Sequence, residues 1–566
     1  MKILGFYLGG HDSSAVIYDD NTSEIKYLKS ERWVGVKHHH ANLEWINQFM
    51  KKHNFVPDVI VYSDGNRNKL GKCSSPHELY KKQDDIEIVN KLNKNLNTNT
   101  EEIYLVDHHF THILSCWPLV DTDEVDYGVT IDGSGDWTER VTIIKNPKDV
   151  VDKKYLEAGV KTKVENILVK MQDFNPSGVL TQLGVRMKLY GSKIDMAGKI
   201  MGAYAYGNLD QDFIDNIKEK LTDGLSGINQ RLQTDIQWSD FKWDGDKLVT
   251  NDNIPDKAKD YLMDMIDVRN LCEPPYDLDN QTFVDYLTTN HHLIGEIIRD
   301  LFLDTITDKD SIVTYSGGTA QNTVWNEILF SHFKNLHIPP HAYDGGLSLG
   351  CVEFARILFD LKKMKFDNFP FIQDDKELTE PDEATIDEVV DLLVDGKIVG
   401  WFQGAGEVGP RALGNRSILM HPGLKDGKDI INERVKHREY WRPFAPSVLE
   451  EHAHEWFTLN EPSPYMLRAV TTRENKRDII PSVTHKDYSS RVQTISKEQN
   501  NLYYTLIKKF YDKTGIPLVL NTSLNDGGYP IFSHREQCIN FLKNSDFDAM
   551  CIGSKLYYKD SIDDIK

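Results

Sequence analysis

The sequence predicts an α/β protein with two related lobes, because one strand–turn–strand pattern occurs twice along the chain. In the first copy, the apolar runs 3–8 and 15–18 flank a turn of glycine, histidine, aspartate and serine. In the second copy, the runs 127–131 and 141–144 flank a turn rich in aspartate and glycine. Apolar runs separated by a short polar turn are typical of β-hairpins, and recurrence after roughly a hundred residues indicates an internal repeat.

A third turn, Ser-Gly-Gly-Thr at 316–319, lies between the apolar run 312–315 and a helical stretch at 320–329. Free backbone N–H groups at a helix N-terminus and the helix dipole both favour a bound anion. Two related hairpins followed by such an anion cradle indicate the actin-like ATPase architecture, in which ATP lies between two related lobes.

An acidic segment divides the chain near residue 370. Residues 373–382 are rich in aspartate and glutamate, and a new strand-like run begins at 397. Charged segments with little apolar content are typical of linkers. We therefore predict two domains, 1–370 and 371–566.

Composition narrows the class of protein. The chain has 566 residues and a formal net charge of −21, which excludes a uniformly basic nucleic-acid surface but not a local basic groove. The six scattered cysteines form no Cys-x-x-Cys pair, which favours a reduced, cytoplasmic protein. No apolar run reaches the ~20 residues of a bilayer span, and the glycine-bounded start does not have the form of a signal peptide.

The segment 107–112 carries two histidines, His108 and His112, four residues apart. On a helix this spacing places both imidazoles on one face, where they can reach one metal ion. Asp132 ends the second hairpin strand and Asp344 lies in an Asp-Gly-Gly turn, so either could complete the site. Two histidines and two carboxylates suit iron, manganese or zinc better than magnesium. The alternative is a helix that merely carries histidines, and the flanking Asp-Gly turns favour the metal.

His11 lies at the tip of the first hairpin, next to Asp12. A histidine near a phosphate-binding turn can act as a general base on an acceptor hydroxyl. A histidine that only satisfies hydrogen bonds of the turn fits the pattern equally well, so both alternatives stay open. The three histidines at 38–40 are assigned to a surface loop, because adjacent histidines cannot share one face of a helix.

Five basic residues lie close together in the otherwise acidic chain: Arg411, Arg416, Lys436, Arg438 and Arg442. Guanidinium and ammonium groups bind phosphate well. The arginines alternate with glycine, proline and alanine rather than with glutamate at helical spacing, which favours a phosphate pocket over a solvated basic face. Arg491 and Asn521 add donors at the ends of two further strand-like runs.

Together and in this order, these segments resemble the NodU/CmcH-type O-carbamoyltransferase family, whose members carbamoylate sugars and antibiotics. The resemblance covers nearly the whole chain, and its most specific part is the arginine-rich segment 409–417. It implies an actin-like (ASKHA) Kae1-like domain over 1–370, followed by a YrdC-like α/β domain over 371–566. The other matching segments are 10–15, 108–112, 132–133, 198–207, 316–322, 344–346, 442–446, 491–493 and 521–523.

The resemblance also implies roles for individual residues. The implied metal ligands, with iron(II) favoured and manganese or zinc open, are His108, His112, Asp132 and Asp344. The implied ATP contacts, with magnesium accompanying the nucleotide, are Lys199, Gly202, Ser316, Gly317, Gly318 and Asn322. The implied carbamoyl phosphate pocket consists of Arg411, Lys436, Arg442, Arg491 and Asn521. His11 is the implied base for the acceptor hydroxyl.

The implied reaction converts carbamoyl phosphate and ATP to carbamoyl adenylate and then transfers the carbamoyl group to a hydroxyl. The favoured acceptor is a small molecule, a sugar or a nucleoside. A 5-hydroxymethylated pyrimidine in DNA, flipped out or unpaired, is the alternative. A nucleotide-binding scaffold without transferase activity would lack the phosphate ligands, which are present. A homodimer stays open.

Two related systems are disfavoured, and three local departures stand out. The acidic chain argues against a threonylcarbamoyl-transfer system for tRNA, and no cysteine-rich zinc segment of a hydrogenase-maturation enzyme is visible. The chain departs from the family pattern at 203–205, at 488–490 and at 528–530, where it has Ala-Tyr-Ala, Tyr-Ser-Ser and Gly-Tyr-Pro. These departures concern the nucleotide lobe and the carbamoyl pocket.

Overall fold

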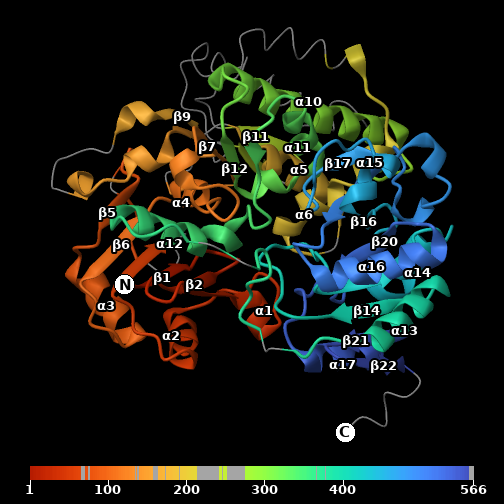
Figure 1. Cartoon of the computed structure of the whole chain (residues 1–566). Coiled ribbons are helices and arrows are strands. Elements are labelled where there is room, and N and C mark those ends of the chain that lie inside the picture. Colours follow the sequence, from red (N-terminus) through yellow and green to blue (C-terminus); the bar gives the residue numbers. More distant parts are fainter. Residues whose placement is uncertain are drawn as a thin grey trace.

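The computed structural model contains three main sheets, with the N-terminal lobes on one side and the C-terminal domain on the other (Figure 1). The structure describes residues 1–559 except for 65–69, 74, 76, 134, 137–138, 157–162, 172–173, 190, 213, 215–240, 245–246, 251–273, 365, 367 and 376–377. Of the six cysteines, Cys272 lies outside the described residues, and the other five are free and buried. Among the described helices, none combines the length and the apolar character that a membrane span requires.

The first sheet contains the first predicted hairpin. Its strand order is β3-β2-β1-β4-β6-β5. Strands β1, β2 and β3 are antiparallel neighbours, whereas β1, β4 and β6 run parallel. The strand bounds are β1 Lys2–Tyr7, β2 Ser14–Asp19, β3 Glu24–Lys29, β4 Val59–Ser63, β5 Tyr80–Lys82 and β6 Glu102–Val106. The helices of this lobe are α1 Ser30–Val34, α2 Leu43–Lys52, α3 Ile86–Leu96, α4 His108–Leu114 and α12 Leu347–Leu358.

The second sheet repeats this topology. Its strand order is β13-β12-β7-β8-β9. Strands β7, β8 and β9 are antiparallel neighbours, and β7, β12 and β13 run parallel. The strand bounds are β7 Tyr127–Ile131, β8 Val141–Lys145, β9 Ile167–Met171, β12 Val313–Ser316 and β13 Leu336–His337. The helices are α5 Pro176–Arg186, α6 Lys193–Ile200, α10 Gln281–Thr305 and α11 Thr323–Phe330. A separate hairpin joins β10 Phe241–Asp244 to β11 Lys247–Thr250.

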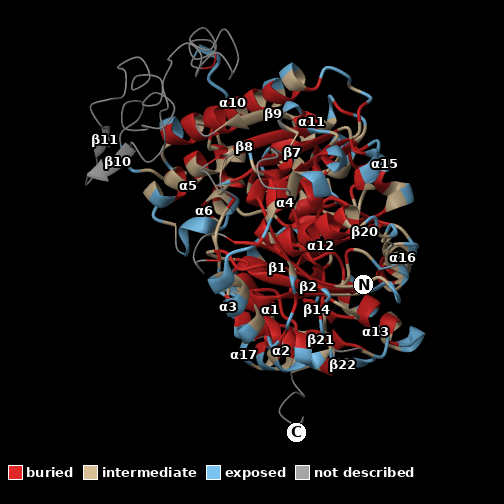
Figure 2. Cartoon of the chain, turned by 90° about the vertical axis from the view of Figure 1, so that its left-hand side faces the viewer, coloured by how far each residue is buried: buried red, intermediate tan, exposed pale blue. Residues whose placement is uncertain are grey.

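The two sheets therefore share one plan of three antiparallel strands followed by two parallel ones. This duplication confirms the predicted actin-like architecture. The helix expected from 320 begins instead at Thr323, because Asn322 caps it: the Asn322 Oδ1 accepts from the backbone N–H of Val324 and of Trp325. Apolar residues of both sheets are buried against α12 and α10, so each lobe has a core of its own (Figure 2).

The C-terminal domain is the predicted second α/β unit. Its seven-stranded mixed sheet has the order β19-β16-β20-β15-β14-β21-β22. One face packs against α13 Glu383–Val394 and α16 Asn501–Thr514, and the other carries α14 Gly427–Ile431 and α17 Arg535–Asn544. The strand bounds are β14 Val399–Phe402, β15 Arg416–Met420, β16 Ala445–Leu449, β19 Gln493–Ile495, β20 Leu518–Ser523, β21 Ala549–Ile552 and β22 Lys555–Tyr558. A short helix α15 Ala453–Trp456 and a two-stranded sheet, β17 Ala469–Thr471 with β18 Ser489–Arg491, complete the domain.

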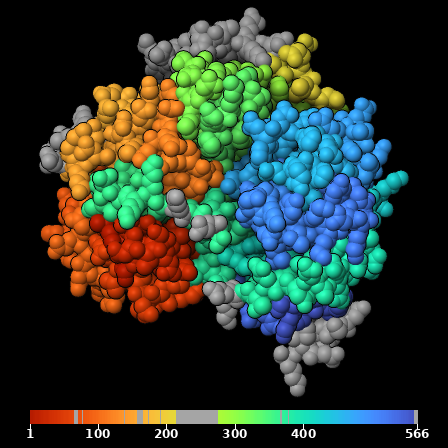
Figure 3. All heavy atoms as spheres, viewed as in Figure 1, coloured from red at the N-terminus to blue at the C-terminus, as the bar shows by residue number. Residues whose placement is uncertain are grey.

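The C-terminal domain lies directly against the two lobes (Figure 3). The guanidinium of Arg468 donates to both carboxylate oxygens of Glu327 at 2.7 and 2.9 Å, and Arg32 donates to the carbonyl of Gly409 at 2.7 Å. The acidic segment predicted as a linker is anchored on both sides. Asp374 pairs with Lys52 of the first lobe at 2.7 Å, and Asp375 pairs with the buried Arg416 at 2.6 Å. The boundary near residue 370 stays a prediction.

Replacing Gly317 by alanine should destabilise the lobe of the second sheet. Gly317 has a φ of +93°, and an added Cβ would lie 2.3 Å from the carbonyl oxygen of Ile131. Gly515→Ala is the matched control, because its φ is +72° but nothing lies within 4 Å of an added Cβ. The control carries only backbone strain of about 1 kcal/mol. In thermal unfolding followed by circular dichroism, Gly317→Ala should lower the midpoint by several degrees more than Gly515→Ala. Equal midpoints would contradict this account.

Candidate functional site

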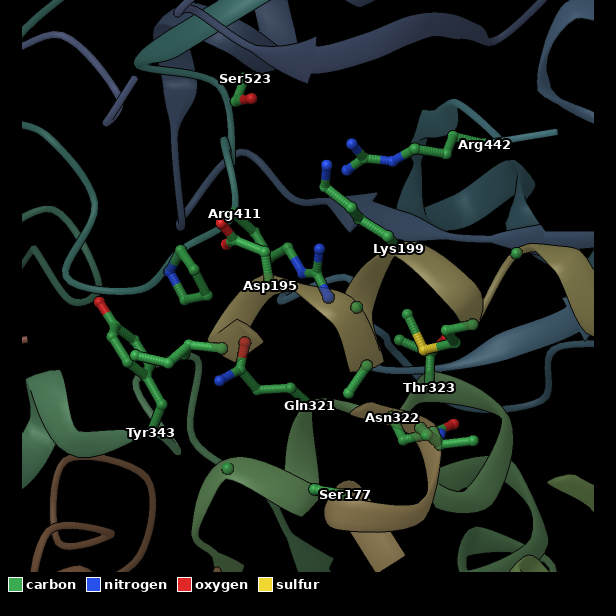
Figure 4. Close-up of a pocket in the computed structure, with 18 of the residues that line it drawn as sticks. Ser177, Asp195, Lys199, Gln321, Asn322, Thr323, Tyr343, Arg411, Arg442 and Ser523 are labelled. Atoms are coloured by element: carbon green, nitrogen blue, oxygen red, sulfur yellow. The ribbon is translucent and has the colours of Figure 1, made fainter. Parts of the chain in front are cut away.

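A cavity of about 680 Å³ lies where the two lobes meet the C-terminal domain. Figure 4 shows its lining residues, with Lys199, Arg442 and Arg411 on one side of the space and Asn322, Thr323 and Ser177 on the other. The predicted residues that line it are His11, Asp132, Asp344, Lys199, Gly202, Gly318, Asn322, Arg411, Lys436, Arg442, Arg491 and Asn521. The remaining four, His108, His112, Ser316 and Gly317, lie behind the lining.

The four predicted metal ligands form one buried cluster. Helix α4 begins at His108 because Asp107 caps it, accepting from the N–H of Phe110 at 2.9 Å. The helix then presents both histidines on one face, as their spacing predicts. One potential ligand atom from each of four residues lies within 4.8 Å of the others: His108, His112, Asp132 and Asp344.

The chemistry of this cluster fits a bound metal. His108 Nε2 lies 3.5 Å from Asp132 Oδ2, and His112 Nε2 lies 3.4 Å from Asp344 Oδ1. Both Nε2 atoms are buried without a hydrogen-bond partner among the described residues. Buried polar atoms normally have partners, so these atoms are poised for a ligand. Tyr7 donates to Asp344 Oδ2 at 2.8 Å and fixes the second oxygen of that carboxylate, as partners of metal ligands usually do.

His109, between the two ligand histidines, is excluded from the cluster. Its Nδ1 is 2.9 Å from the hydroxyl of Thr142, on the far side of the helix. Burial lowers the pKa of His109 to about 3. At His108 burial also opposes protonation, but the carboxylates of Asp344 and Asp132 outweigh it and raise the pKa to about 10. The cluster therefore favours a positive charge at the position that a metal would take.

His11 is held by a carboxylate beside this cluster. Its Nδ1 lies 2.8 Å from Asp12 Oδ2 and 3.8 Å from Asp344 Oδ2, and its side chain is 34% exposed, so Nε2 is free to meet a molecule in the cavity. Asp12 in turn pairs with the buried Lys29 at 2.9 Å. Burial lowers the pKa of His11, but the hydrogen bond that its Nδ1 donates to Asp12 and the charge of Asp344 raise the pKa overall. Because a specific partner orients the ring, the geometry favours the general-base alternative over a simple turn histidine.

His38 was assigned to a surface loop, and this assignment is wrong in one respect. The residue is on a loop, but its side chain lines the cavity. Its Nε2 lies 3.2 Å from Asp195 of α6, and its Nδ1 lies 3.5 Å from Asp12. Burial opposes protonation of His38, yet these two carboxylates raise its pKa to about 9. Sequence spacing could not reveal this, because the partners come from distant segments.

A second acidic group, Asp12, Glu31 and His38, also has metal-like spacing. Lys29 already lies inside it, 2.9 Å from Asp12 and 2.6 Å from Glu31. The ammonium group compensates both carboxylates, so this group is an ion-pair network.

The glycine turn after β12 joins the four-residue cluster to the side of the cavity that is predicted to bind ATP. The N–H of Gly318 donates to Asp132 Oδ1 at 2.6 Å. The N–H of Gly317 is occupied by the carbonyl of Ala342 at 2.7 Å, and Ser316 is fully buried. Of the predicted ATP contacts on this turn, Gly318 and Asn322 therefore reach the cavity, whereas Ser316 and Gly317 shape the turn from behind.

Lys199 and Gly202, the other predicted ATP contacts, lie against the C-terminal domain. Lys199 Nζ is 3.2 Å from Glu439 Oε1, and Arg442 approaches Glu439 Oε2 at 3.6 Å. The carbonyl of Gly202 accepts from His485 Nε2 at 2.7 Å. These two residues therefore belong to the wall between the nucleotide lobe and the basic cluster.

The predicted phosphate-binding residues converge on the cavity. Lys436 donates to oxygens of Ser523 and Asn525, three of them at 2.8–2.9 Å. Asn521 donates through Nδ2 to Ala412, Ser447 and Gln493, while its Oδ1 is buried without a partner among the described residues. Lys436 and Asn521 are thus fixed by neutral groups, which leaves the charge of Lys436 uncompensated.

Positive charge dominates this part of the wall. Within the described chain, no carboxylate lies within 4.0 Å of the charged groups of Arg411, Lys436, Arg438 or Arg491. Burial and the neighbouring Arg442 lower the pKa of Arg411 to about 10. Burial and the adjacent arginines likewise lower the pKa of Lys436 and of Arg491 well below their usual values. Such a concentration of unpaired cations is a strong attraction for a phosphorylated ligand.

Arg416, predicted as part of the basic cluster, has a structural role instead. It is fully buried and donates to Asp375 and to the carbonyls of Gly404 and Asn415. Arg438, which was not assigned a role, does line the cavity and donates to Asn432 at 2.8 Å. The alternation of arginine with glycine and proline does not distinguish these two positions.

Two solved structures that are similar to this one share less than 15% of their sequence with it. Component A of (R)-2-hydroxyglutaryl-CoA dehydratase from Acidaminococcus fermentans is 12% identical, with a TM-score of 0.32, over 63% of this chain and 99% of that chain. Full-length HypF is 14% identical, with a TM-score of 0.27, over 62% of this chain and 55% of that chain. Because both TM-scores are low, the fold assignment rests on the strand order of the two N-terminal sheets.

Sequence comparisons are more specific. Nodulation protein NolNO of Sinorhizobium fredii is 35% identical over 270 residues, which is 44% of this chain and 40% of that protein. Nodulation protein NolO of Bradyrhizobium diazoefficiens is 33% identical over 267 residues (43% and 48%), and nodulation protein U of the same species is 36% identical over 224 residues (38% and 39%). The matched regions thus span about half, or less, of these relatives' own length.

Two family models match successive parts of the chain. The model described as carbamoyltransferase N-terminus matches residues 76–352, and the model described as carbamoyltransferase C-terminus matches residues 390–559. Together they take in both faces of the cavity, from the histidine pair of α4 to the strand that carries Asn521. The chain belongs to the carbamoyltransferase family.

Proposed function

We propose that this protein is an ATP-dependent O-carbamoyltransferase that activates carbamoyl phosphate and transfers the carbamoyl group to an acceptor hydroxyl within one cavity. The observation that carries the proposal is that the unpaired cations of the C-terminal domain line the same space as His11 and as Asp132 and Asp344, the two carboxylates of the four-residue cluster. A nucleotide-binding scaffold would not need a general base beside a phosphate pocket.

Activation is assigned to the basic wall, by which we mean the part of the cavity lining formed by Arg411, Lys436, Arg438, Arg442 and Arg491. Arg411, Arg442 and Arg491 would bind the phosphate of carbamoyl phosphate. One bound water molecule would hydrolyse it to carbamate and inorganic phosphate before the nucleotide reacts. A carbamate oxygen then attacks the α-phosphorus of ATP, the bond to pyrophosphate breaks, and carbamoyl adenylate forms. Asn322, on the facing wall, and Lys199, which shares Glu439 with Arg442, would hold the nucleotide. Enclosure is favourable for this sequence, because carbamate decomposes and the mixed anhydride hydrolyses if water enters.

Transfer is assigned to His11. The Nε2 of a neutral His11 accepts the proton of the acceptor hydroxyl, whose oxygen attacks the carbamoyl carbon while the bond to AMP breaks. Asp12 holds Nδ1–H at 2.8 Å, which fixes the tautomer and stabilises the imidazolium that forms. The product is an O-carbamoyl ester, and the proton is carried away by His11.

The four-residue cluster would hold a divalent metal, with iron favoured and manganese or zinc as alternatives. His108, His112, Asp132 and Asp344 are the ligands, and Tyr7 orients Asp344. When bound, such an ion supplies a Lewis acid that stabilises negative charge on an oxygen of the reacting group. Magnesium would accompany ATP as its usual counter-ion.

The two steps should separate by mutation. Arg411→Ala should lower both carbamoyl adenylate formation and transfer at least a hundredfold, because a phosphate ligand is lost. His11→Asn should leave adenylate formation near its wild-type rate and slow transfer about 10²–10⁴-fold, the usual contribution of a general base. Pyrophosphate release reports the first step, and radiolabelled carbamoyl product reports the second. Arg434→Ala is the matched control, because this arginine is half-exposed and faces Asp546 outside the cavity. Full transfer by both test variants would refute the assigned roles.

Metal content should depend on His112 and not on its neighbour His109. His112→Gln removes a buried imidazole that faces Asp344, so the metal-to-protein ratio measured by plasma mass spectrometry should fall from about one to near zero. His109→Gln should retain the metal, because His109 points to Thr142. Circular dichroism would verify that both variants are folded. Equal metal content in the two variants would argue against the cluster.

The acceptor is the remaining question, and a small-molecule hydroxyl is our proposal. The experiment that tests it combines radiolabelled carbamoyl phosphate and ATP with sugars, nucleosides and alcohol-bearing natural products. A 5-hydroxymethylated pyrimidine is included as a nucleoside, in single-stranded DNA and in duplex DNA. Labelling of DNA alone would favour the alternative acceptor, whereas labelling of no acceptor, with adenylate formation intact, would leave only the activation step supported.

A further inference from the structure

Three stacked aromatic rings lie at the side of the cavity that carries Asn322, and the proposed reaction gives them no role. Two of them, Tyr204 and Trp325, line the cavity, and His291 lies behind them. His291 of α10 lies between Tyr204 and Trp325. The His291 and Tyr204 rings are 4.5 Å apart and inclined by 6°, and the His291 and Trp325 rings are 4.9 Å apart and inclined by 26°. We call these three side chains the aromatic stack. His291 is 1% exposed, so its imidazole meets only protein.

His291, the buried ring of the stack, contacts the cavity lining through the side chain of Asn322. The Oδ1 of Asn322 accepts from the backbone N–H groups of Val324 and Trp325 at 3.2 and 3.3 Å, because Asn322 caps α11. This cap fixes which end of the amide is oxygen. The Nδ2 then faces His291 Nε2 at 3.0 Å. An amide nitrogen can only donate, so His291 Nε2 must be the acceptor.

Acceptance at Nε2 requires a neutral imidazole. Burial, with a smaller effect of His292, lowers the pKa of His291 to about 3, so the ring stays neutral over the whole working range. The indole N–H of Trp325 donates to the carbonyl of His291 at 2.8 Å. This bond ties one of the two flanking rings to the backbone of His291. The imidazole is thus confined between two rings, which leaves it little freedom to turn away from Asn322.

Tyr204 extends this arrangement to the C-terminal domain. Its hydroxyl donates to Asp487 Oδ2 at 3.2 Å, and its carbonyl accepts from Thr288 of α10. Tyr204 lies in the Ala-Tyr-Ala segment that departs from the family pattern. The ring that covers His291 is therefore attached to the domain that carries the basic wall.

We propose that His291 is a positioning residue, held by the aromatic stack, that orients the amide of Asn322 for a nucleotide in the cavity. The inference rests on the proposed function, which assigns Asn322 to the ATP site. One N–H of the Asn322 amide is occupied by His291, and Asn322 lines the cavity. The second N–H is the donor that the amide offers to a phosphate or ribose oxygen.

A double-mutant cycle tests whether His291 acts through Asn322. His291→Phe keeps a ring between Tyr204 and Trp325 but removes the acceptor. Asn322→Ala removes the donor. Binding of a non-hydrolysable ATP analogue with Mg²⁺ is measured by calorimetry on the full chain. Each single variant should weaken the Kd about five- to tenfold, which is the usual size of one hydrogen bond. The double variant should bind no more weakly than Asn322→Ala alone. Wild-type affinity in His291→Phe would overturn the inference. A double variant whose loss of affinity equals the product of the two single losses would overturn it as well.

A second pair of variants keeps the inference testable if His291→Phe does not fold. Tyr204→Leu uncovers one face of His291 while the acceptor remains, and it should weaken analogue binding about two- to fivefold. Tyr206→Leu is the matched control, because this tyrosine lies on the same short helical turn but contacts Tyr440 and His485 instead. Equal effects of the two variants would contradict a specific role of the stack.

Two further readouts separate this inference from the proposed function. The Kd for carbamoyl phosphate should not change in any of these variants, since its pocket lies on the opposite wall. With saturating ATP, turnover should recover to within about twofold of wild type, as expected for a residue that affects binding rather than chemistry. If the wild-type protein binds no nucleotide, the proposed function fails. If the wild-type protein binds the analogue and His291→Phe does not change the Kd, only the proposed role of His291 fails.

Discussion

The carboxylate of Asp132 is the contact on which the geometry of the site depends. One oxygen accepts from the N–H of Gly318 at 2.6 Å, and the other lies 3.5 Å from His108 Nε2. This is possible because β7 and β12 are parallel neighbours, so their carboxyl ends lie side by side, where ligands bind in open α/β sheets. Burial would raise the pKa of Asp132, but His108 and His112 hold it well below its usual value. One ionised carboxylate therefore fixes the proposed metal ligands and the glycine turn at Gly318 relative to each other.

The basic wall poses the opposite electrostatic problem, since four of its cations have no carboxylate within 4.0 Å in the described chain: Arg411, Lys436, Arg438 and Arg491. Only Arg442 has such a partner, Glu439 at 3.6 Å. Desolvated cations without partners are costly, and neutral oxygens around Lys436 compensate this only in part. Stability must therefore come from contacts outside the cavity, such as the Arg468–Glu327 pair and the Arg416–Asp375 pair. An anion that binds the folded protein would add to this stability by mass action. The lack of carboxylate partners for these cations thus lowers the stability of the free protein but favours the binding of an anion.

Local patterns in the sequence were sufficient to predict the repeated hairpins, the glycine turn and the shared helix face of His108 and His112. Each of these depends on residues that are close in sequence, where strand alternation, turn chemistry and capping operate. The family resemblance supplied the reaction and the roles of individual residues. Neither source predicted that His38 meets Asp12 and Asp195, that Arg416 is structural, or that His291 accepts from Asn322. Three of these contacts join residues that lie 26 to 41 positions apart in the chain, and the contact of His38 with Asp195 spans 157 positions. They therefore follow only from the tertiary packing.

The position of Gly202 links the two halves of the proposed reaction. A Cβ at this residue would lie 2.9 Å from Pro443 Cδ and 3.3 Å from the carbonyl of Trp441. Its own carbonyl accepts from His485 at 2.7 Å. A side chain at 202 would thus push the nucleotide lobe away from the segment that carries Arg442, even if ATP never touched this residue. Since the cavity has walls from both domains, the same separation would open it to water. The requirement for glycine here therefore follows from the close approach of the two domains, and a closed cavity depends on that approach.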